Sequence, residues 1–145
     1  MATPSKLKRI VDLFAGAPND VKLEALLEYS RKLPPLPDRF GRDPGLMEAV
    51  PECQTPFFLA TEVAQDGTVA VWFDCPPEAP TTRGFAGILA EGLNGARVED
   101  VLALPDAFYT EMGLEGAISS LRLRGMSAIL ARLKRQVGEA APAPA

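Results

Sequence analysis

A pair of short alternating segments limits the possible folds of this chain more than any other feature of its sequence. Residues 57–63 (FFLATEV) and 69–73 (VAVWF) place apolar or β-branched side chains at every second position. That period is typical of half-buried strands, and the Asp66-Gly67 pair between the segments favours a hairpin turn. We therefore predict an antiparallel β-hairpin. Pro56 cannot donate a ladder hydrogen bond, so it belongs at the start of the first strand.

Proline-rich segments precede and follow this hairpin. Residues 33–51 contain five prolines and two glycines, and we expect no regular structure there. Loops longer than about 12–15 residues are usually functional or disordered. This segment leads directly to Cys53, and the second one, residues 75–80 (CPPEAP), begins with the other cysteine, Cys75.

Helical periodicity is present on both sides of the hairpin. Residues 19–32 carry Leu23, Leu26 and Leu27 at spacings of three and four, and a shorter helix is expected over 6–14. Further helices are expected over 81–93, 98–104 and 120–137, and the low-complexity residues 139–145 are expected to form a disordered tail.

The order of these elements predicts an α+β fold. A chain of 145 residues, 47% of them hydrophobic, is suited to one domain with one core, which we place at residues 1–138. A small antiparallel sheet would have helices packed on one face. Because an isolated hairpin is only marginally stable, we expect a third strand, for which the segment before Cys53 is the candidate.

The chain contains no histidine, and this excludes several kinds of site. Ser-His-Asp and Cys-His catalysis, proton transfer by imidazole and the commonest metal ligand are all removed. The two cysteines are not spaced as a CxxC pair, and two thiolates without histidine make a poor zinc site. We therefore predict no metal site.

The charge of the chain limits its expected partners, and its hydropathy limits the compartments in which we expect it. A net charge of −4 and a pI near 4.9 argue against nucleic-acid binding, and the arginines after residue 120 fit a solvated helix face. The sequence has neither a long apolar run nor a secretory signal pattern. We expect a cytoplasmic protein that does not enter membranes.

Cys53 is the candidate reactive residue. Glu52 and Gln54 beside it are polar, so the local pattern does not require an apolar residue there, although a free cysteine is often simply buried. Glu52 would raise the pKa of the thiol, so an activating cation must come from elsewhere in the chain. Cys75, after two apolar residues and before two prolines, fits a structural role better.

Arg122 is the candidate for that cation. The last predicted helix has one apolar stripe, and Arg122 lies on the same face, four residues before Met126, whereas Arg132 and Arg135 fall away from it. A cation in the first turn of a helix opposes the helix dipole, which suits an anionic partner such as a thiolate or a carboxylate. Alternatively, its guanidinium extends into water over the rim of the core.

Five stretches together resemble the SufE family, sulfur acceptors that act with PLP-dependent cysteine desulfurases in iron–sulfur cluster assembly. The resemblance extends from about residue 11 to residue 136. In chain order the stretches are KLEALLEYSRKLPPL (22–36), VPECQTPFFL (50–59), EAPTTRGFAGIL (78–89), DAFYTEMGL (106–114) and LRLRGMSAILARLK (121–134).

This resemblance implies a SufE/IscU-like fold and a role for each candidate residue. Cys53, in its Cys-Gln-Thr context, would receive sulfane sulfur as a persulfide, and Arg122 would match the family arginine near the cysteine loop. Glu78 and Arg83 would match positions that face the desulfurase. The partners would be a SufS-like cysteine desulfurase, which holds the PLP, and a downstream Fe–S scaffold, while this chain would need no cofactor.

The sequence departs from the family at Glu52, where better-known relatives have glycine, and at the Cys-Pro-Pro insertion before Glu78. Both affect expectations about loop mobility and partner choice. In the free protein we expect the loop to place Cys53 in an apolar pocket walled by Phe57 or Phe58 and by Arg122, and to extend when docked.

Three other functions remain open from the residues. A cluster scaffold of the IscU kind would bind metal, but through three cysteines and often a histidine. A thiol peroxidase or redox sensor would use Cys53 with Arg122 and Cys75 as activating and resolving groups. A structural interaction domain would not depend on Cys53.

Overall fold

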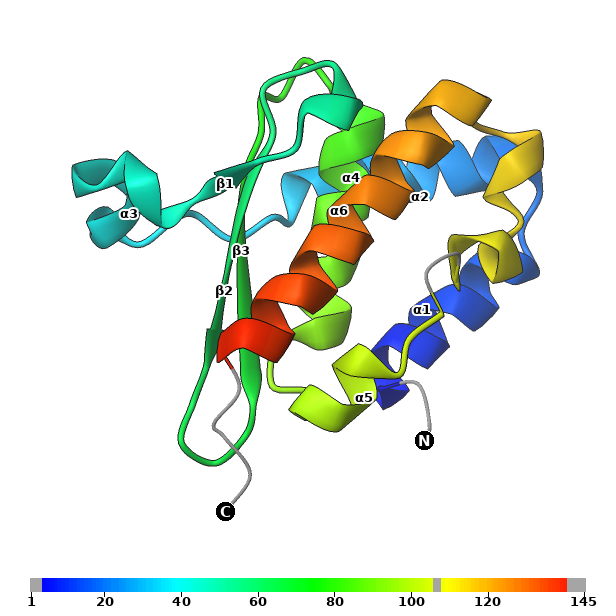
Figure 1. Cartoon of the computed structure of the whole chain (residues 1–145). Coiled ribbons are helices and arrows are strands. Elements are labelled where there is room, and N and C mark those ends of the chain that lie inside the picture. The colour runs from blue at the N-terminus through cyan, green and yellow to red at the C-terminus, as the bar shows by residue number, and fades with distance from the viewer. Residues whose placement is uncertain (1–3, 106–107, 141–145) are drawn as a thin grey trace.

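A computed structural model describes residues 4–105 and 108–140 of the chain. Its order is helix, helix, sheet, helices, as predicted, in one α+β arrangement (Figure 1). In the described residues the α-helices are α1 (Ser5–Ala15), α2 (Asn19–Arg31), α3 (Asp38–Arg42), α4 (Pro80–Leu93), α5 (Val98–Leu102) and α6 (Ser120–Ala140). The strands are β1 (Glu48–Ala49), β2 (Phe58–Val63) and β3 (Val69–Asp74).

The sheet is antiparallel in the order β1-β2-β3, which confirms both the hairpin and the third strand before Cys53. Leu59 of β2 lies opposite Phe73 of β3, and Val63 lies opposite Val69. These positions share one face, and Leu59, Val69 and Phe73 are almost fully buried there. Because the apolar side chains of the alternating pattern point to this face of the sheet, the helices pack against it.

Helix α4 lies in the centre of the molecule, with the sheet on one side and α1 and α2 on the other (Figure 1). Gly84 and Gly87 allow its close contact with α2, because a Cβ at either position would collide with a backbone carbonyl of Leu26 or Tyr29. Phe85, Ile88 and other apolar residues of α4 are completely buried. A helix that is apolar on most sides is typical of such a central position.

Helix α6 packs across β2, and its predicted apolar stripe is confirmed. Met126, Ile129, Leu130, Leu133 and Val137 are all buried. Gln136 accepts a hydrogen bond from the hydroxyl of Thr61 on β2, 3.2 Å away. The helix extends to Ala140, so the predicted tail is wrong at residues 139–140, and residues 141–145 lie outside the described residues.

The proline-rich segment is more ordered than predicted, since it contains α3. Phe40 of this short helix packs on Trp72 of β3 with ring centroids 6.1 Å apart, and Arg39 forms an ion pair with Glu62 at 2.6 Å. The partners of these two contacts lie in strands 23 and 32 residues later in the chain, and local sequence patterns do not reveal them.

The prediction that Leu23, Leu26 and Leu27 form the apolar face of a helix over residues 19–32 is only partly correct. Leu26 is buried, but Leu23 and Leu27 are 44% and 39% exposed. Lys22 and Ser30 are buried with Leu26, because Lys22 reaches the carbonyl of Gly113 at 3.2 Å and the Ser30 hydroxyl bonds to Leu27 O. Within the described residues no helix has both the length and the apolar composition needed to span a bilayer.

Candidate functional site: the cavity beside Cys53

Cys53 ends a single 3-10 turn, η2 (Pro51–Cys53), between β1 and β2. Val50, which is buried, donates a backbone hydrogen bond to Phe57 O at 2.8 Å and thereby closes the base of the turn. Gln54 then adopts a left-handed conformation (φ 59°), and its N–H bonds to Pro51 O at 3.0 Å. The chain therefore reverses direction directly at the cysteine and carries it toward α6.

The thiol rests on the backbone of α6 at Gly125. The Cys53 Sγ atom lies 3.9 Å from Gly125 O, and a Cβ added at Gly125 would lie 3.4 Å from both Cys53 Cα and Sγ. The absence of a side chain at Gly125 leaves room for the thiol. Sequence reasoning missed Gly125, although a glycine inside a helix costs about 1 kcal/mol relative to alanine and can indicate a close contact.

Burial raises the pKa of Cys53 from its ordinary 9.0 to about 12, and the negative charge of Glu52 and the nearby Cys75 act in the same direction. The positive charge of Arg132 opposes them. In this conformation the side chain is half-buried and remains a protonated thiol at neutral pH.

A group of charged residues holds the cysteine segment against α6. Arg132 forms ion pairs with Glu52 (Nη1 to Oε2, 3.1 Å) and Glu48 (Nε to Oε2, 3.4 Å). Arg135 also pairs with Glu48, and Gln136 donates a hydrogen bond to the same carboxylate at 2.9 Å. Hydrogen bonds and these cations hold the pKa of Glu48 below its ordinary value. We call Glu48, Glu52, Arg132, Arg135 and Gln136 the ionic clamp.

The sequence places Arg132 and Arg135 away from the apolar face of the helix, and this pattern did not predict that they hold the cysteine segment. Arg132 follows Gly125 by seven residues, so both lie on the same side of α6, beside the cysteine segment. In the folded protein the positive charge of Arg132 lowers the pKa of Cys53, against the larger effect of burial. The guanidinium of Arg132 lies beside the turn because the carboxylates of Glu48 and Glu52 attract it.

A cavity of about 400 Å³ opens beside Cys53. The turn contributes Gln54 and Thr55, the start of α4 contributes Thr82, and Glu78 and Arg122 border the cavity from their own segments. Four of the residues predicted from sequence, Cys53, Gln54, Glu78 and Arg122, thus line the same space. Glu52 does not line the cavity and belongs to the ionic clamp.

The expectation that Phe57 or Phe58 forms a wall of the cavity is wrong. Phe57 is buried against Phe73 in the core, and Phe58 lines separate hollows on the sheet. Arg83, which the resemblance places at the surface facing the desulfurase, donates hydrogen bonds to Ser30 O (2.9 Å) and Cys75 O (2.6 Å). Its guanidinium therefore ties α2 to the residues after β3.

Cys75 is 5% exposed and packs in the core, as its neighbours suggested. Burial raises the pKa of its thiol to about 11, although the guanidinium of Arg83 acts in the opposite direction. In the described part of the chain, no cluster of three or more histidine, cysteine, aspartate or glutamate side chains could hold a metal ion.

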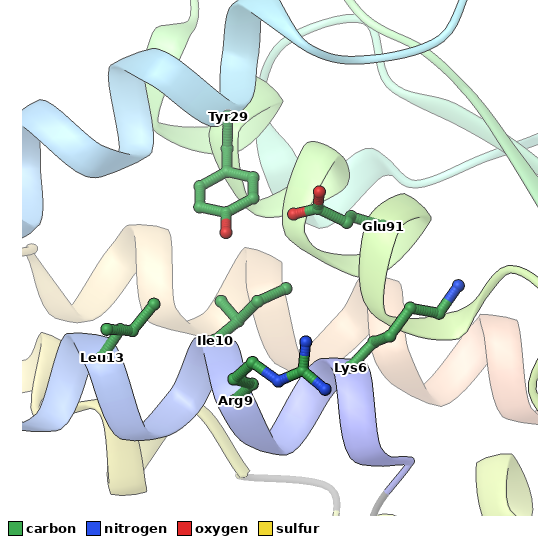
Figure 2. A pocket seen from close by; sticks show the side chains of 6 residues that line it. All are labelled: Lys6, Arg9, Ile10, Leu13, Tyr29 and Glu91. Carbon is green, nitrogen blue, oxygen red and sulfur yellow. The ribbon is translucent and has the colours of Figure 1, made fainter.

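A second hollow, of about 200 Å³, lies between α1, α2 and α4 (Figure 2). Ile10 and Leu13 come from α1, Tyr29 from α2 and Glu91 from α4. Burial and Glu91 raise the pKa of Tyr29 to about 12. None of the residues predicted as functional lines this hollow, and it contains no sulfur.

Known proteins of similar sequence are described as SufE or SufE-like. Residues 8–137 match the SufE family, described as an Fe-S metabolism associated domain. An uncharacterised SufE-like protein of Mycobacterium tuberculosis is 50% identical over 137 residues, which cover 94% of each chain. A cysteine desulfuration protein SufE of Plasmodium falciparum is 27% identical over 134 residues, which cover 89% of this chain and 52% of that protein.

A solved structure shares the fold along nearly the whole chain. The solution structure of a hypothetical protein from Thermus thermophilus matches with a TM-score of 0.83 and 46% sequence identity, covering 96% of this chain and 98% of that one. The sequence match, the shared fold and the cysteine turn agree with the resemblance seen in the five sequence stretches. The chain belongs to the SufE family of Fe–S metabolism associated domains.

Proposed function

We propose that this protein is a sulfur carrier that accepts sulfane sulfur on Cys53 from a PLP-dependent cysteine desulfurase. It would stimulate that enzyme and pass the sulfur to a downstream scaffold for iron–sulfur cluster assembly. The position of Cys53 carries the proposal: it ends a three-residue turn at the edge of an open cavity. Membership of a family that includes cysteine desulfuration proteins supports it.

The transfer step requires only a thiolate, access and a good leaving thiol. The Cys53 thiolate attacks the terminal sulfur of the desulfurase persulfide and forms a new S–S bond. The original S–S bond breaks, and its electron pair stays on the desulfurase cysteine as a thiolate. The product is a persulfide on Cys53. The PLP chemistry belongs to the partner, so this chain acts as an accessory protein rather than as the enzyme.

The resting conformation is poorly suited to this attack. A thiol with a pKa of about 12 is ionised in roughly one molecule in 10⁵ at pH 7. Burial is the largest cause of that shift, so moving the turn away from Gly125 lowers the pKa as well as exposing the sulfur. We expect the desulfurase to bind the open form, and the exposed Glu78 and Arg122 lie where it would dock.

Peroxide consumption by the protein alone separates a thiol peroxidase from a sulfur carrier, because only the peroxidase turns peroxide over on Cys53. A structural interaction domain is separated from a sulfur carrier by the effect of removing the thiol.

Alanine release by a SufS-like desulfurase, with cysteine as substrate, tests the proposal. We expect the wild-type chain to accelerate release, and Cys53→Ala to abolish the acceleration. Cys75→Ala is the matched control and should keep most of it, since Cys75 is in the core. Equal acceleration by wild type and Cys53→Ala would contradict sulfur acceptance and favour a structural interaction.

A further inference from the structure

The cavity beside Cys53 contains a polar group that the fold does not use. Thr82 lines the cavity and is only 8% exposed, and its hydroxyl has no hydrogen-bond partner among the described residues. The Thr55 hydroxyl oxygen is also without a partner in the described chain, but it is fully buried and does not open into the cavity. Because polar groups on buried side chains are nearly always hydrogen-bonded, the unpaired hydroxyl of Thr82 indicates a polar occupant.

The mouth of the cavity carries both signs of charge. The backbone N–H of Arg122 donates a hydrogen bond to Ser119 Oγ (3.3 Å), but the guanidinium of Arg122 pairs with no carboxylate of the described residues. The Glu78 carboxylate likewise forms no ion pair within the described part of the chain. Both side chains are exposed and free to turn toward a ligand. A guanidinium favours a carboxylate ligand, and a carboxylate favours an ammonium.

The size of the cavity is suited to a small molecule. Its volume of about 400 Å³ falls within the range of roughly 300–1,000 Å³ that is typical of ligand pockets. The polar groups surround a sulfur atom that, on the proposed function, carries a transferable sulfur. An occupant with a carboxylate, an ammonium and a thiol would match Arg122, Glu78 and Cys53 at once.

We propose that this cavity binds a small amino-acid thiol, such as free cysteine, which accepts the sulfur from Cys53 without a second protein. The inference rests on the proposed function for the persulfide itself. In the reaction, the thiolate of the small molecule attacks the outer sulfur of the Cys53 persulfide. A new S–S bond forms on the small molecule, the bond to Cys53 Sγ breaks, and Cys53 leaves as a thiolate. No oxidant or reductant is required.

The test does not need the desulfurase. The full-length chain is incubated with inorganic polysulfide, which donates sulfur to thiolates, and excess polysulfide is removed. Intact mass then confirms one added sulfur, with Cys53→Ala as the unloaded control. Loss of the added sulfur is followed with three acceptors: cysteine, cysteamine (which lacks the carboxylate) and 3-mercaptopropionate (which lacks the ammonium). Rates are compared per thiolate present.

We expect the rate with cysteine to saturate and to exceed that of the other two thiols by about tenfold, the contribution typical of one charge-assisted hydrogen bond. Arg122→Gln should bring the ratio of cysteine to cysteamine toward one, and Glu78→Gln should do the same for cysteine against 3-mercaptopropionate. Arg124→Gln is the matched control: this exposed arginine of α6 does not line the cavity, so its ratios should equal those of wild type.

Rates that rise linearly with each thiol and rank only by thiolate reactivity would overturn the inference. Because polysulfide loads Cys53 without the desulfurase, this test is independent of the desulfurase assay. Failure of cysteine binding would leave the proposed sulfur transfer from the desulfurase standing. Failure of the desulfurase assay would likewise leave the cysteine site standing.

If polysulfide does not load Cys53, binding of S-methylcysteine to the unloaded chain decides the question. Saturable NMR shifts at Thr55 and Thr82 that Arg122→Gln removes would support the site. Unchanged signals at these residues would refute it.

Discussion

At the scale of single residues, Gly125 and Cys53 determine how accessible the sulfur is. A Cβ at Gly125 would touch Cys53 at 3.4 Å, which is an ordinary van der Waals contact, so the position tolerates alanine but not a branched side chain. The resting thiol is thus packed against helix backbone with almost no space to spare. The same packing keeps it protonated.

We predict that Gly125→Val pushes the cysteine turn off α6 and raises the rate of Cys53 alkylation by iodoacetamide at pH 8. Gly125→Ala is the matched control, with alkylation near the wild-type rate and stability increased by up to about 0.5–1 kcal/mol from helix propensity. A wild-type alkylation rate in a folded Gly125→Val protein would contradict the packing described here.

The two cysteines also make stability depend on pH. Their pKa values are about 12 and 11 in the folded protein against an ordinary 9.0, so near pH 10 the unfolded chain has lost protons that the folded chain retains. The free energy of unfolding should therefore fall as pH rises from about 9. The raised pKa of Tyr29 adds to the fall above pH 10.

Urea unfolding at pH 8 and pH 10.5 measures this dependence. Cys75→Ala should show a smaller loss of stability between the two pH values than wild type, since one of the two proton-retaining thiols is gone. An equal or larger loss in Cys75→Ala would show that the buried thiol is not a source of the effect.

At the scale of elements, the ionic clamp joins β1 and η2 to α6. Arg132 and Arg135 reach carboxylates that lie on both sides of Pro51, and Gln136 connects Glu48 to the same helix. Ion pairs at this level of exposure are individually weak, and salt screens them further. The clamp is therefore weak enough to release the segment when a partner docks, as the proposed function requires.

We predict that Arg132→Gln increases hydrogen exchange of residues 48–55 by about 2- to 10-fold, because the two weak ion pairs that Arg132 forms with this segment are lost. Arg124→Gln, the same change at a position outside the clamp, should leave exchange unchanged. Exchange in wild type should also rise with salt, and this rise should be smaller in Arg132→Gln. Equal exchange in the two arginine variants would show that the clamp does not hold the turn closed.

How far each element could be predicted depends on whether its cause is local. The hairpin and the stripe from Met126 to Val137 were predictable, because period and turn residues lie within one segment. Helix α3 and the role of Arg132 were not, because they depend on strands and carboxylates distant in sequence. Cys53 was identified from its polar neighbours, whereas the glycine beneath it and the unpaired hydroxyl of Thr82 emerged only from packing.

At the scale of the whole molecule, a rigid core carries the cysteine turn, which on the proposed function moves away from it. The sheet, α4 and α6 share one buried core, and the cysteine turn is attached to that body mainly through polar contacts and one glycine. The cavity beside the turn lies between the starts of α4 and α6. This arrangement allows the sulfur to be protected at rest and presented without unfolding the core.

Intact-protein mass spectrometry tests the central claim most directly. Wild-type and Cys53→Ala chains are incubated with an active cysteine desulfurase and a limiting amount of cysteine that the enzyme consumes, and both are measured before any reductant is added. The account predicts a one-sulfur mass increase on wild type alone, which dithiothreitol then removes. No increase on wild type, or the same increase on Cys53→Ala, would contradict the assignment of Cys53 as the sulfur carrier.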